Sequence, residues 1–299
     1  MDRFHLLSVF VAVAEEESFA SAARKLRMSP PAVTRAITSL EHRLGVKLLT
    51  RTTRFVRMTD AGHRYRDSAR RILAEMDEAD DAAAGVHGEP RGHIAVTAPA
   101  LFGRMFVVPG IVDYLKRFPA MSVSALFLDR VVNLVEEGLD VGIRIGELPD
   151  STMQAIGVGY VRRVVCASPA YLADKGIPQS PRALSEHTIV AASSMSPTVE
   201  WRFASGSKAT NVKVTPRLTV TNNDAAIEAA LQGLGLTCLL SYQVAQHVAT
   251  GQLQVVLHDY ETPRVPIHVL HHEGRQVSAK VRTFVDVLVQ RLRSDKTLR

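Results

Sequence analysis

The apolar residues near the start of the chain recur at helical spacing in three separate runs. Apolar side chains stand three or four positions apart at Phe4, Leu7, Val11 and Ala14, then at Ala20, Ala23 and Leu26, and then at Val33, Ile37, Leu40 and Leu44. This spacing places them on one face of an α-helix. The pattern therefore predicts three helices: the first over residues 4–15, the second short, and the third ended by Gly45.

The second and third helices are separated by a turn of three to four residues that contains "RMS", residues 27–29. Pro30 and Pro31 fix where the third helix begins, because proline lacks an N–H that would be unpaired in a first helical turn, and Ser29 or Pro30 then occupies the cap. This is a helix-turn-helix arrangement. The outward face of the third helix then carries Thr34, Arg35, Thr38 and His42. Such a helix is sized for the DNA major groove, where its N-terminal part meets base edges and phosphates.

Residues 46–62 alternate in a manner typical of a β-ribbon. The segment carries Arg51, Arg54 and Arg57 at intervals of three. A basic ribbon beside a recognition helix is a wing that reaches the DNA backbone or the minor groove.

From Asp60 the pattern changes to that of one long helix. Its apolar residues are spaced 4, 3, 4, 3 and 4 positions apart, at Tyr65, Ala69, Ile72, Met76, Ala79 and Ala83. This heptad seam predicts a dimerisation helix, and the alternative is a helix packed on its own domain. The segment 85–93 is rich in glycine and ends the helix, so we interpret it as a hinge.

The remainder of the chain alternates strand-like and helical runs. Strand-like runs are expected over 93–98, 122–127, 139–145, 162–168, 212–220, 234–240 and 265–271, and helical runs over 109–118, 131–137, 223–231, 241–249 and 277–292. This alternation predicts an α/β fold with mainly parallel sheets. We expect three domains: 1–60 for DNA binding, 61–90 as linker helix and hinge, and 91–299 as an α/β domain. The last domain could form one sheet or two lobes, and we expect two lobes, 91–162 plus 266–299, and 163–265.

Charge is concentrated in the first part of the chain. Residues 18–58 hold nine basic side chains and one acid, a net of +8, whereas all 299 residues together carry +6, so the rest sums to −2. A basic segment before a near-neutral body is typical of a module that binds a polyanion, although a solvated basic face is the alternative.

The first residues could be mistaken for a secretory signal. However, Asp2 and Arg3 give no net positive charge, and Glu15, Glu16 and Glu17 follow the apolar run at once. No run approaches the roughly 20 apolar residues of a membrane span. Cys166 and Cys238 lie in apolar strand-like runs and are expected to be buried free thiols, which suits a reducing compartment. We therefore expect a cytoplasmic protein with no membrane partner.

The N-terminal segment closely resembles LysR-type transcriptional regulators. The resemblance is dense from Phe19 to Gly62, through the runs "SPPAVTRAITSLEHRLG" and "RTTRFVRMTDAG", and continues more loosely to the C-terminal helix. It implies a mixed fold: an all-α winged helix-turn-helix domain with a linker helix, then a two-lobed α/β domain similar to periplasmic solute-binding proteins. It also implies a homodimer or homotetramer that bends double-stranded promoter DNA under control of a small-molecule effector, with RNA polymerase as a further candidate partner.

Carried over by position, the resemblance and the helix pattern assign eight DNA-binding residues: Ser29, Pro30, Pro31, Thr34, Arg35, Thr38, Arg51 and Arg54. The family commonly has Gln at the position of Pro30. Proline offers no side-chain donor, so Thr34, Arg35 and the wing would carry more of the recognition.

Three segments are candidates for the effector site. Ligands of α/β sheets gather beyond the carboxyl ends of strands, often at helix N-termini that attract anions. The candidates are Ala98, Pro99, Ala100, Leu101 and Phe102; Leu128 and Asp129, expected to begin a helix; and Thr221, Asn222 and Asn223, with Arg144 as a bidentate partner for a carboxylate. The alternatives are that Asn222 and Asn223 only cap a helix and that Arg144 forms a surface ion pair. Pro99 stands where some family members that sense aromatic acids place a hydroxyl.

Catalytic interpretations find little support. Ser205-x-x-Lys208 has the spacing of a serine-nucleophile motif, but its S-D-N and K-T-G partner motifs are absent. Gly233-x-Gly235 runs into a strand and does not open a helix, so it does not bind a phosphate. His268 and His272 lie on one strand face, but no further metal ligands accompany them. We expect no enzyme, no catalytic residue, no metal and no cofactor. The rival interpretations are a periplasmic solute-binding protein whose N-terminal helices are a targeting relic, and a hydrolase on the α/β body.

Overall fold

The computed structural model describes residues 2–51, 56–83, 89–148, 153–192, 199–205, 208–272 and 278–299. The chain divides into two compact units, Met1–Gly88 and Glu89–Arg299. Each has its own hydrophobic core, so each is described separately.

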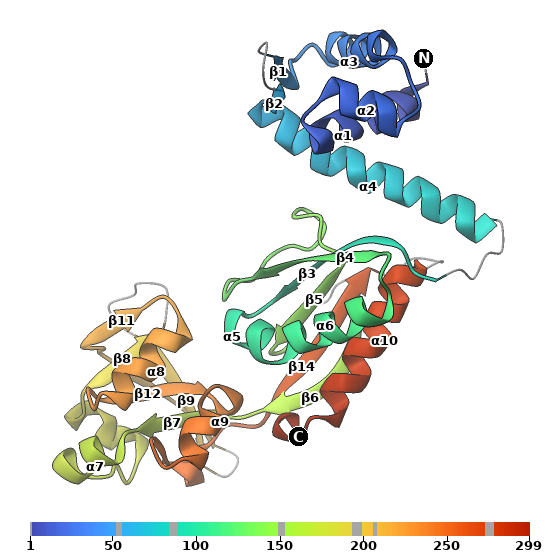
Figure 1. The fold of residues 1–299 in the computed structure, drawn as a ribbon. Helices are drawn as coiled ribbons and strands as arrows, with labels where there is room; N and C mark the ends of the chain where they lie inside the picture. The colour runs from blue at the N-terminus through green and yellow to red at the C-terminus, as the bar shows by residue number, and fades with distance from the viewer. Residues whose placement is uncertain are drawn as a thin grey trace. The chain divides into compact units, whose positions relative to one another are not determined.

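The first unit is a helical domain with a two-stranded ribbon (Figure 1). Its elements are α1 (Arg3–Glu16), α2 (Phe19–Lys25), α3 (Pro30–Leu44), β1 (Leu49–Arg51), β2 (Val56–Met58) and α4 (Asp60–Ala83). The core joins α1, α2 and α3 to the start of α4, with Phe10, Val33 and Ile37 fully buried. The three expected helices, the ribbon and the long helix are thus confirmed.

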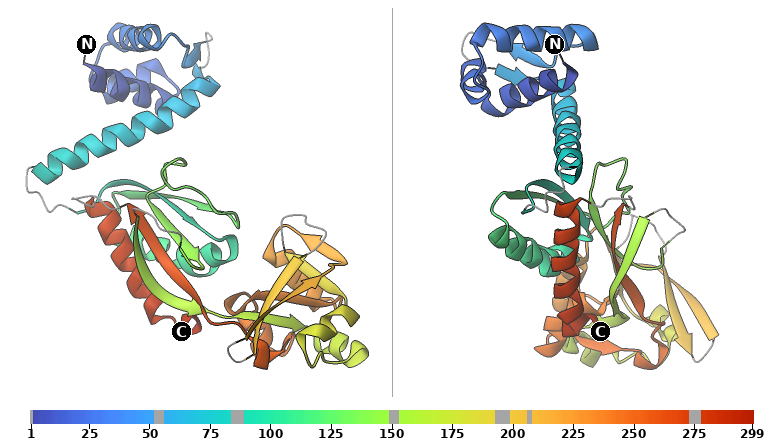
Figure 2. Two further views of the ribbon diagram at one scale, coloured as in Figure 1. Left: turned by 180° about the vertical axis from the view of Figure 1, so that it is seen from behind. Right: turned by 90° about the vertical axis from the view of Figure 1, so that its right-hand side faces the viewer.

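The first lobe of the second unit is a five-stranded sheet with helices packed against it. We define this lobe as residues 89–161 plus 265–299. It contains β3 (Gly92–Ala98), α5 (Ala100–Phe102), the π-helical turn η1 (Gly103–Val107), α6 (Val108–Arg117), β4 (Met121–Phe127), β5 (Val141–Ile145), β6 (Met153–Val161), β14 (Val265–His272), α10 (Ala279–Ser294) and the 3-10 turn η4 (Lys296–Leu298). The strand order is β4-β3-β5-β14-β6, and α10 packs against β3, β6 and β14 as well as α6 (Figure 2).

The second lobe, residues 163–260, repeats this plan. It contains β7 (Arg163–Ala167), α7 (Pro169–Lys175), η2 (Pro181–Glu186), β8 (Ile189–Ala192), β9 (Val199–Ser205), β10 (Lys208–Val214), β11 (Leu218–Val220), α8 (Asn223–Leu231), β12 (Leu236–Leu240), α9 (Ser241–Ala249), β13 (Gln254–Val256) and η3 (His258–Tyr260). Its main sheet has the order β11-β8-β12-β7-β13, and β9 and β10 form a separate antiparallel hairpin.

The expectation of mainly parallel sheets is wrong. In the first lobe β3 pairs in parallel with β4 and β5, whereas β14 pairs antiparallel with β5 and β6. In the second lobe β8 pairs in parallel with β11 and β12, whereas β7 is antiparallel to β12 and β13. The cause is that the chain crosses between the lobes twice, at residue 162 and at residues 261–264, and its last strand inserts between β5 and β6.

A helix expected over residues 131–137 is also absent from this fully described stretch. The segment forms turns with Leu134 buried and with Val131 and Val135 exposed. Its alternation of apolar and polar residues is therefore satisfied by two side chains, Val132 and Leu134, which enter a small core with Leu139 and Leu270.

Candidate DNA-binding and effector sites

The recognition helix α3 begins at an unusual N-terminus. Ser29 occupies the N-cap position, and its side chain makes no capping hydrogen bond. Pro30 and Pro31 have no N–H, and the next two, on Ala32 and Val33, donate to the Ser29 carbonyl at 2.9 and 3.2 Å. The first turn of α3 therefore leaves no backbone N–H free for a phosphate, and any contact there must come from side chains.

The two faces of α3 differ as expected from the sequence. Val33, Ile37 and Leu40 are at most 1% exposed. On the opposite side the expected contact residues Ser29, Pro30, Pro31, Arg35 and Thr38 are exposed, and Thr34 is half-buried. The Thr38 hydroxyl donates to the Thr34 carbonyl at 3.0 Å. The inward and outward interpretation of this helix is confirmed, with Thr34 at the edge of its exposed face.

The turn that precedes α3 is tight. Helix α2 ends at Lys25, and four residues, 26–29, separate it from Pro30. Arg27 adopts a left-handed conformation with φ of 53°, which is uncommon for a residue with a side chain. This turn fixes the angle between α2 and α3.

The wing is an antiparallel ribbon of two short strands. Leu49, Thr50 and Arg51 pair with Met58, Arg57 and Val56, and Arg57 is exposed. Arg54 lies outside the described residues, and the side chain of Arg51 is not described. The ribbon itself is confirmed, whereas the contacts of these two arginines stay a prediction.

A buried carboxylate joins the recognition helix to the wing. Glu41 is 6% exposed, and its Oε1 accepts hydrogen bonds from the backbone N–H groups of Leu48 and Leu49 at 3.0 and 3.1 Å. Its Oε2 accepts from Lys47 Nζ at 2.7 Å. Burial acts to raise the pKa of Glu41, but the Lys47 ammonium and the two N–H groups outweigh it and lower that pKa.

Sequence reasoning counted Glu41 only as the one acid of a basic segment. A signal was present, because Glu41 lies one turn after the buried Ile37 and next to the buried Leu40. A carboxylate in an apolar stripe needs buried donors. Its position therefore indicated a structural role.

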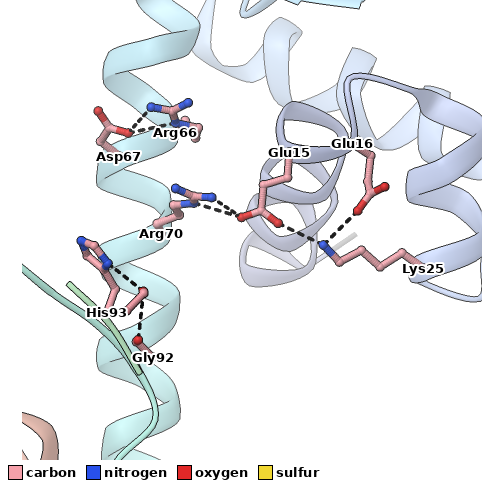
Figure 3. A network of polar contacts seen from close by, with 9 residues as sticks. Glu15, Glu16, Lys25, Arg66, Asp67, Arg70, Gly92 and His93 are labelled. Atoms are coloured by element: carbon pink, nitrogen blue, oxygen red, sulfur yellow. Dashed lines mark hydrogen bonds and ion pairs between the residues drawn. The ribbon is translucent and has the colours of Figure 1, made fainter. Parts of the chain in front are cut away.

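Ion pairs tie the helix pair to the long helix. Glu15 on α1 contacts Lys25 Nζ on α2 at 3.1 Å and accepts from Arg70 Nε on α4 at 3.0 Å, as Figure 3 shows. Lys25 also contacts Glu16 at 3.2 Å. Partial burial acts to raise the pKa of Glu15, but Arg70 and Lys25 lower it overall. These contacts hold α4 against the DNA-binding fold.

The heptad seam of α4 serves two purposes. Its first members pack on their own domain, since Ala69 is 1% exposed and the rings of Tyr65 and Phe10 are 5.5 Å apart. Its next members, Ile72 and Met76, are each 40% exposed. The side chains of Ala79 and Ala83 are not described. The alternative of packing on the same domain thus holds for the first half of the seam.

In the second unit, Asp129 brings together all three segments expected to form the effector site. Its Oδ1 accepts from the backbone N–H of Ala100 at 3.0 Å, and its Oδ2 accepts from Asn223 Nδ2 at 3.4 Å. A second link joins the lobes nearby, where Arg104 contacts Asp224 at 3.2 Å. One carboxylate of the first lobe therefore holds a helix N–H of its own lobe and an amide of the other.

The individual effector candidates differ in exposure. Ala98, Leu101 and Phe102 are at most 3% exposed. The Phe102 ring lies 5.4 Å from that of Tyr242 on α9, so it packs against the second lobe. Pro99, Ala100, Leu128 and Asn223 are partly exposed, whereas Asp129, Thr221 and Asn222 are exposed.

Two details differ from the sequence-based expectations for these segments. Leu128 and Asp129 do not begin a helix but lie at the end of β4 in an irregular bend, where the Leu128 N–H donates to the Ala98 carbonyl at 3.0 Å. Asn222 caps α8, because its side chain accepts from the Ala225 N–H at 2.8 Å. The capping alternative therefore holds for Asn222, and Asn223 instead contacts Asp129.

Arg144 points to a backbone group and makes no ion pair with a described residue. Its guanidinium donates to the Val132 carbonyl, beside the turn over residues 131–137. Burial lowers the pKa of Arg144. No surface ion pair of Arg144 is seen within the part of the chain that the structure describes, and Arg144 braces the loop that follows Asp129.

Two family models match most of the chain. The family model described as "Bacterial regulatory helix-turn-helix protein, lysR family" matches residues 4–63, and the model described as "LysR substrate binding domain" matches residues 87–293. The chain belongs to the LysR family of transcriptional regulators. The helix-turn-helix match does not favour the periplasmic solute-binding alternative.

Known LysR-family proteins match along nearly the whole chain. HTH-type transcriptional regulator CrgA of Neisseria meningitidis is 32% identical over 287 residues, which cover 96% of each chain. PtxR of Pseudomonas aeruginosa is 32% identical over 288 residues, 96% of this chain and 92% of the relative.

Solved structures agree with this assignment. A structure of CrgA covers 96% of this chain and 98% of its own, with a TM-score of 0.62 and 32% identity. The structure of the Vibrio cholerae virulence activator AphB covers 97% of this chain and 99% of its own, with a TM-score of 0.61 and 23% identity. This likeness supports the fold. The winged domain followed by a two-lobed α/β domain is therefore confirmed.

The features considered for catalysis have ordinary structural roles. Ser205 and Lys208 pair across the β9–β10 hairpin, and residues 233–235 lead into β12. Among the described residues no group of three potential metal ligands comes together. No helix in the described part of the chain is long and apolar enough to cross a membrane.

Proposed function

We propose that the chain binds promoter DNA through α3 and the wing, with Ser29, Pro30, Pro31, Thr34, Arg35, Thr38, Arg51 and Arg54 as its contact residues. The observation that carries this assignment is the division of α3 into a buried apolar face and an exposed face with Arg35 and Thr38. Since the two prolines remove backbone donors at the helix start, base reading falls to Arg35 and the hydroxyl groups. Pro30 and Pro31 supply shape and apolar contact with base edges.

The oligomer proposed here is a homodimer or a dimer of dimers. Ile72 and Met76 on α4 leave apolar surface exposed one and two turns beyond the buried Ala69. Pairing these side chains with a second copy would bury that surface. It would also fix the separation of two recognition helices, so that a two-fold-related pair of half-sites is selected.

The effector proposed for the second unit is a small molecule with an anionic group. Asp129 already holds the Ala100 N–H and the Asn223 amide with a carboxylate. A carboxylate of the effector would replace that of Asp129 at these two donors, beside the ion pair of Arg104 with Asp224. Because these groups come from both lobes, the effector would shift the relation between the lobes and thereby the bend of the DNA.

The protein acts in this proposal by binding and not by catalysis. It works in the cytoplasm, because that is where promoter DNA and RNA polymerase are found in bacteria. Contact with RNA polymerase belongs to the same proposal.

The test is binding to the promoter next to the gene for this chain, measured by fluorescence anisotropy and footprinting. Arg35→Ala is expected to weaken specific binding by about 1–3 kcal/mol, or roughly 5- to 150-fold, if the guanidinium reads a base. Arg64→Ala removes an exposed arginine from α4 and serves as the matched control. Wild-type affinity should also fall steeply as salt rises. A flat salt response, or equal effects of the two substitutions, would contradict the assignment.

A further inference from the structure

A cavity of about 290 Å³ lies at the hinge between the two lobes of the second unit. Its apolar wall includes Val161 at the end of β6, Val164 on β7, and Tyr242 and Val244 on α9. These four side chains are at most 4% exposed. The other wall is the C-terminal turn η4, represented by Lys296 and Thr297. The cavity is separate from the cluster around Asp129 and Ala100, because none of those residues lines it.

Both lobes contribute to this cavity. Val161 and η4 belong to the first lobe, whereas Val164 and α9 belong to the second. The two crossings of the chain also border it, through Arg162 and Arg264. A molecule that fills the cavity therefore contacts the two segments about which the lobes would move.

The C-terminal wall is held in place by the fold. Leu298 is 1% exposed and packs into the main core next to Gly159, where a Cβ atom would overlap the Leu298 carbonyl oxygen. Arg293 on α10 donates to the Gly157 carbonyl at 2.9 Å. Asp295 accepts from the Thr297 N–H at 2.9 Å. The cavity is thus built before any ligand arrives, which reduces the ordering that a ligand must cause.

The charges around the cavity are all positive. Its lining includes Arg162, Arg264, Lys296 and Arg299, and no acidic residue. Glu261 neutralises Arg162, with contacts to its NH1 at 2.9 and 3.1 Å. Arg264 and Lys296 are exposed and have no carboxylate within ion-pair distance among the residues that the structure describes. Two cations without an ion-pair partner among the described residues thus line the cavity beside its apolar side chains.

We propose that this hinge cavity binds a small organic anion whose apolar body, about the size of one or two aromatic rings, packs against Tyr160 and Val248, the exposed apolar side chains of its lining. Its carboxylate would lie between Arg264 and Lys296. Apolar burial supplies affinity, and the two cations select for negative charge. The inference is independent of the proposed DNA contacts, since a chain that fails the Arg35 test could still bind this anion.

The experiment is calorimetric titration of the full chain with 2-naphthoate, which is anionic at neutral pH, and with the uncharged 2-naphthamide of the same shape. Naphthoate should bind at least about tenfold more tightly than naphthamide, as expected for two partly solvated ion pairs. The double variant Arg264→Gln/Lys296→Gln should lose about tenfold in naphthoate affinity and retain its unfolding temperature, because both side chains are exposed. The matched control Arg117→Gln/Lys175→Gln removes two exposed cations outside the cavity and should bind naphthoate like the wild type.

A second variant tests the apolar wall. Val248 on α9 lines the cavity and is 37% exposed, so Val248→Trp can fill the space without disturbing the core. It should abolish binding of naphthoate. The proposal is overturned by any of three results: no binding of naphthoate at millimolar concentration, equal affinity for acid and amide, or unchanged affinity in either cavity variant.

Discussion

The contact between Glu41 and the wing leads to a prediction whose magnitude follows from the structure. Glu41→Ala leaves the N–H groups of Leu48 and Leu49 without their acceptor. Each unpaired buried donor lowers stability by about 1–3 kcal/mol, although water that enters the space left by the side chain offsets part of this loss. For the two N–H groups together we expect stability to fall by about 2–4 kcal/mol. Glu41→Gln keeps an oxygen acceptor but loses the negative charge, and we expect this substitution to lower stability by about 1–2 kcal/mol.

Native-state hydrogen exchange measures this loss where it occurs. The one tryptophan, Trp201, lies in the other unit, so fluorescence would not report it. Protection factors of the Leu48 and Leu49 amides should fall by roughly 30- to 1000-fold in Glu41→Ala, since about 1.4 kcal/mol corresponds to tenfold. Lys47 is 76% exposed at its side chain, so Lys47→Ala should lower protection by only about threefold. DNA affinity should fall in parallel with protection, because the wing loses its fixed position.

The same carboxylate predicts a dependence on pH. In the folded chain the pKa of Glu41 is lowered from its ordinary value of 4.5. The contribution of the ionised carboxylate to stability is therefore fully present above pH 4.5 and is lost as the pH falls through the pKa of the folded chain. In Glu41→Gln this loss of stability on acidification should be smaller. If Glu41→Ala protects Leu48 and Leu49 as well as the wild type, or if Lys47→Ala is equally damaging, the buried hydrogen bonds are not what holds the wing.

Three further predictions concern other positions. Gly45 ends α3 with φ of 68° and has open space around it, so Gly45→Ala should lower the free energy of unfolding by about 1 kcal/mol from backbone strain alone. Gly45→Asn should lower it less, as measured by hydrogen exchange of the α3 amides. Equal losses in the two variants would contradict this reasoning. A Cβ atom on Gly62 would overlap the Leu48 carbonyl oxygen, so Gly62→Ala should lower the free energy of unfolding by about 1–3 kcal/mol and weaken DNA binding. A variant with unchanged stability would show that α4 packs differently on β1. Burial raises the pKa of Cys166 to about 12 and that of the half-buried Cys238 to about 11, so both thiols of the folded chain should react with iodoacetamide more slowly at about pH 8 than in urea. Fast labelling of Cys166 in the native chain would contradict its burial.

Local patterns were sufficient for most of the first unit. The spacing of Val33, Ile37 and Leu40 decides which face of α3 is buried, because a helix with one apolar stripe has one way to meet a core. The prolines decide where that helix begins, since only a first turn tolerates two missing N–H groups. The role of Glu41 is different, because its donors come from residues that lie beyond the end of α3.

In the second unit the sequence determined the alternation of strands and helices, the two lobes, and the three segments proposed for the effector site. It did not determine that half of the strand pairs in the two five-stranded sheets are antiparallel, because pairing direction depends on where β14 inserts after the chain has returned from the other lobe. Tertiary structure alone made Asp129 the meeting point of Ala100 and Asn223, and placed Arg264 and Lys296 at one hinge cavity. The physical reason is that spacing along the chain encodes which face of an element is buried, whereas contacts between separate elements, such as those of Asp129 with residues 29 and 94 positions away, exist only once the core has packed.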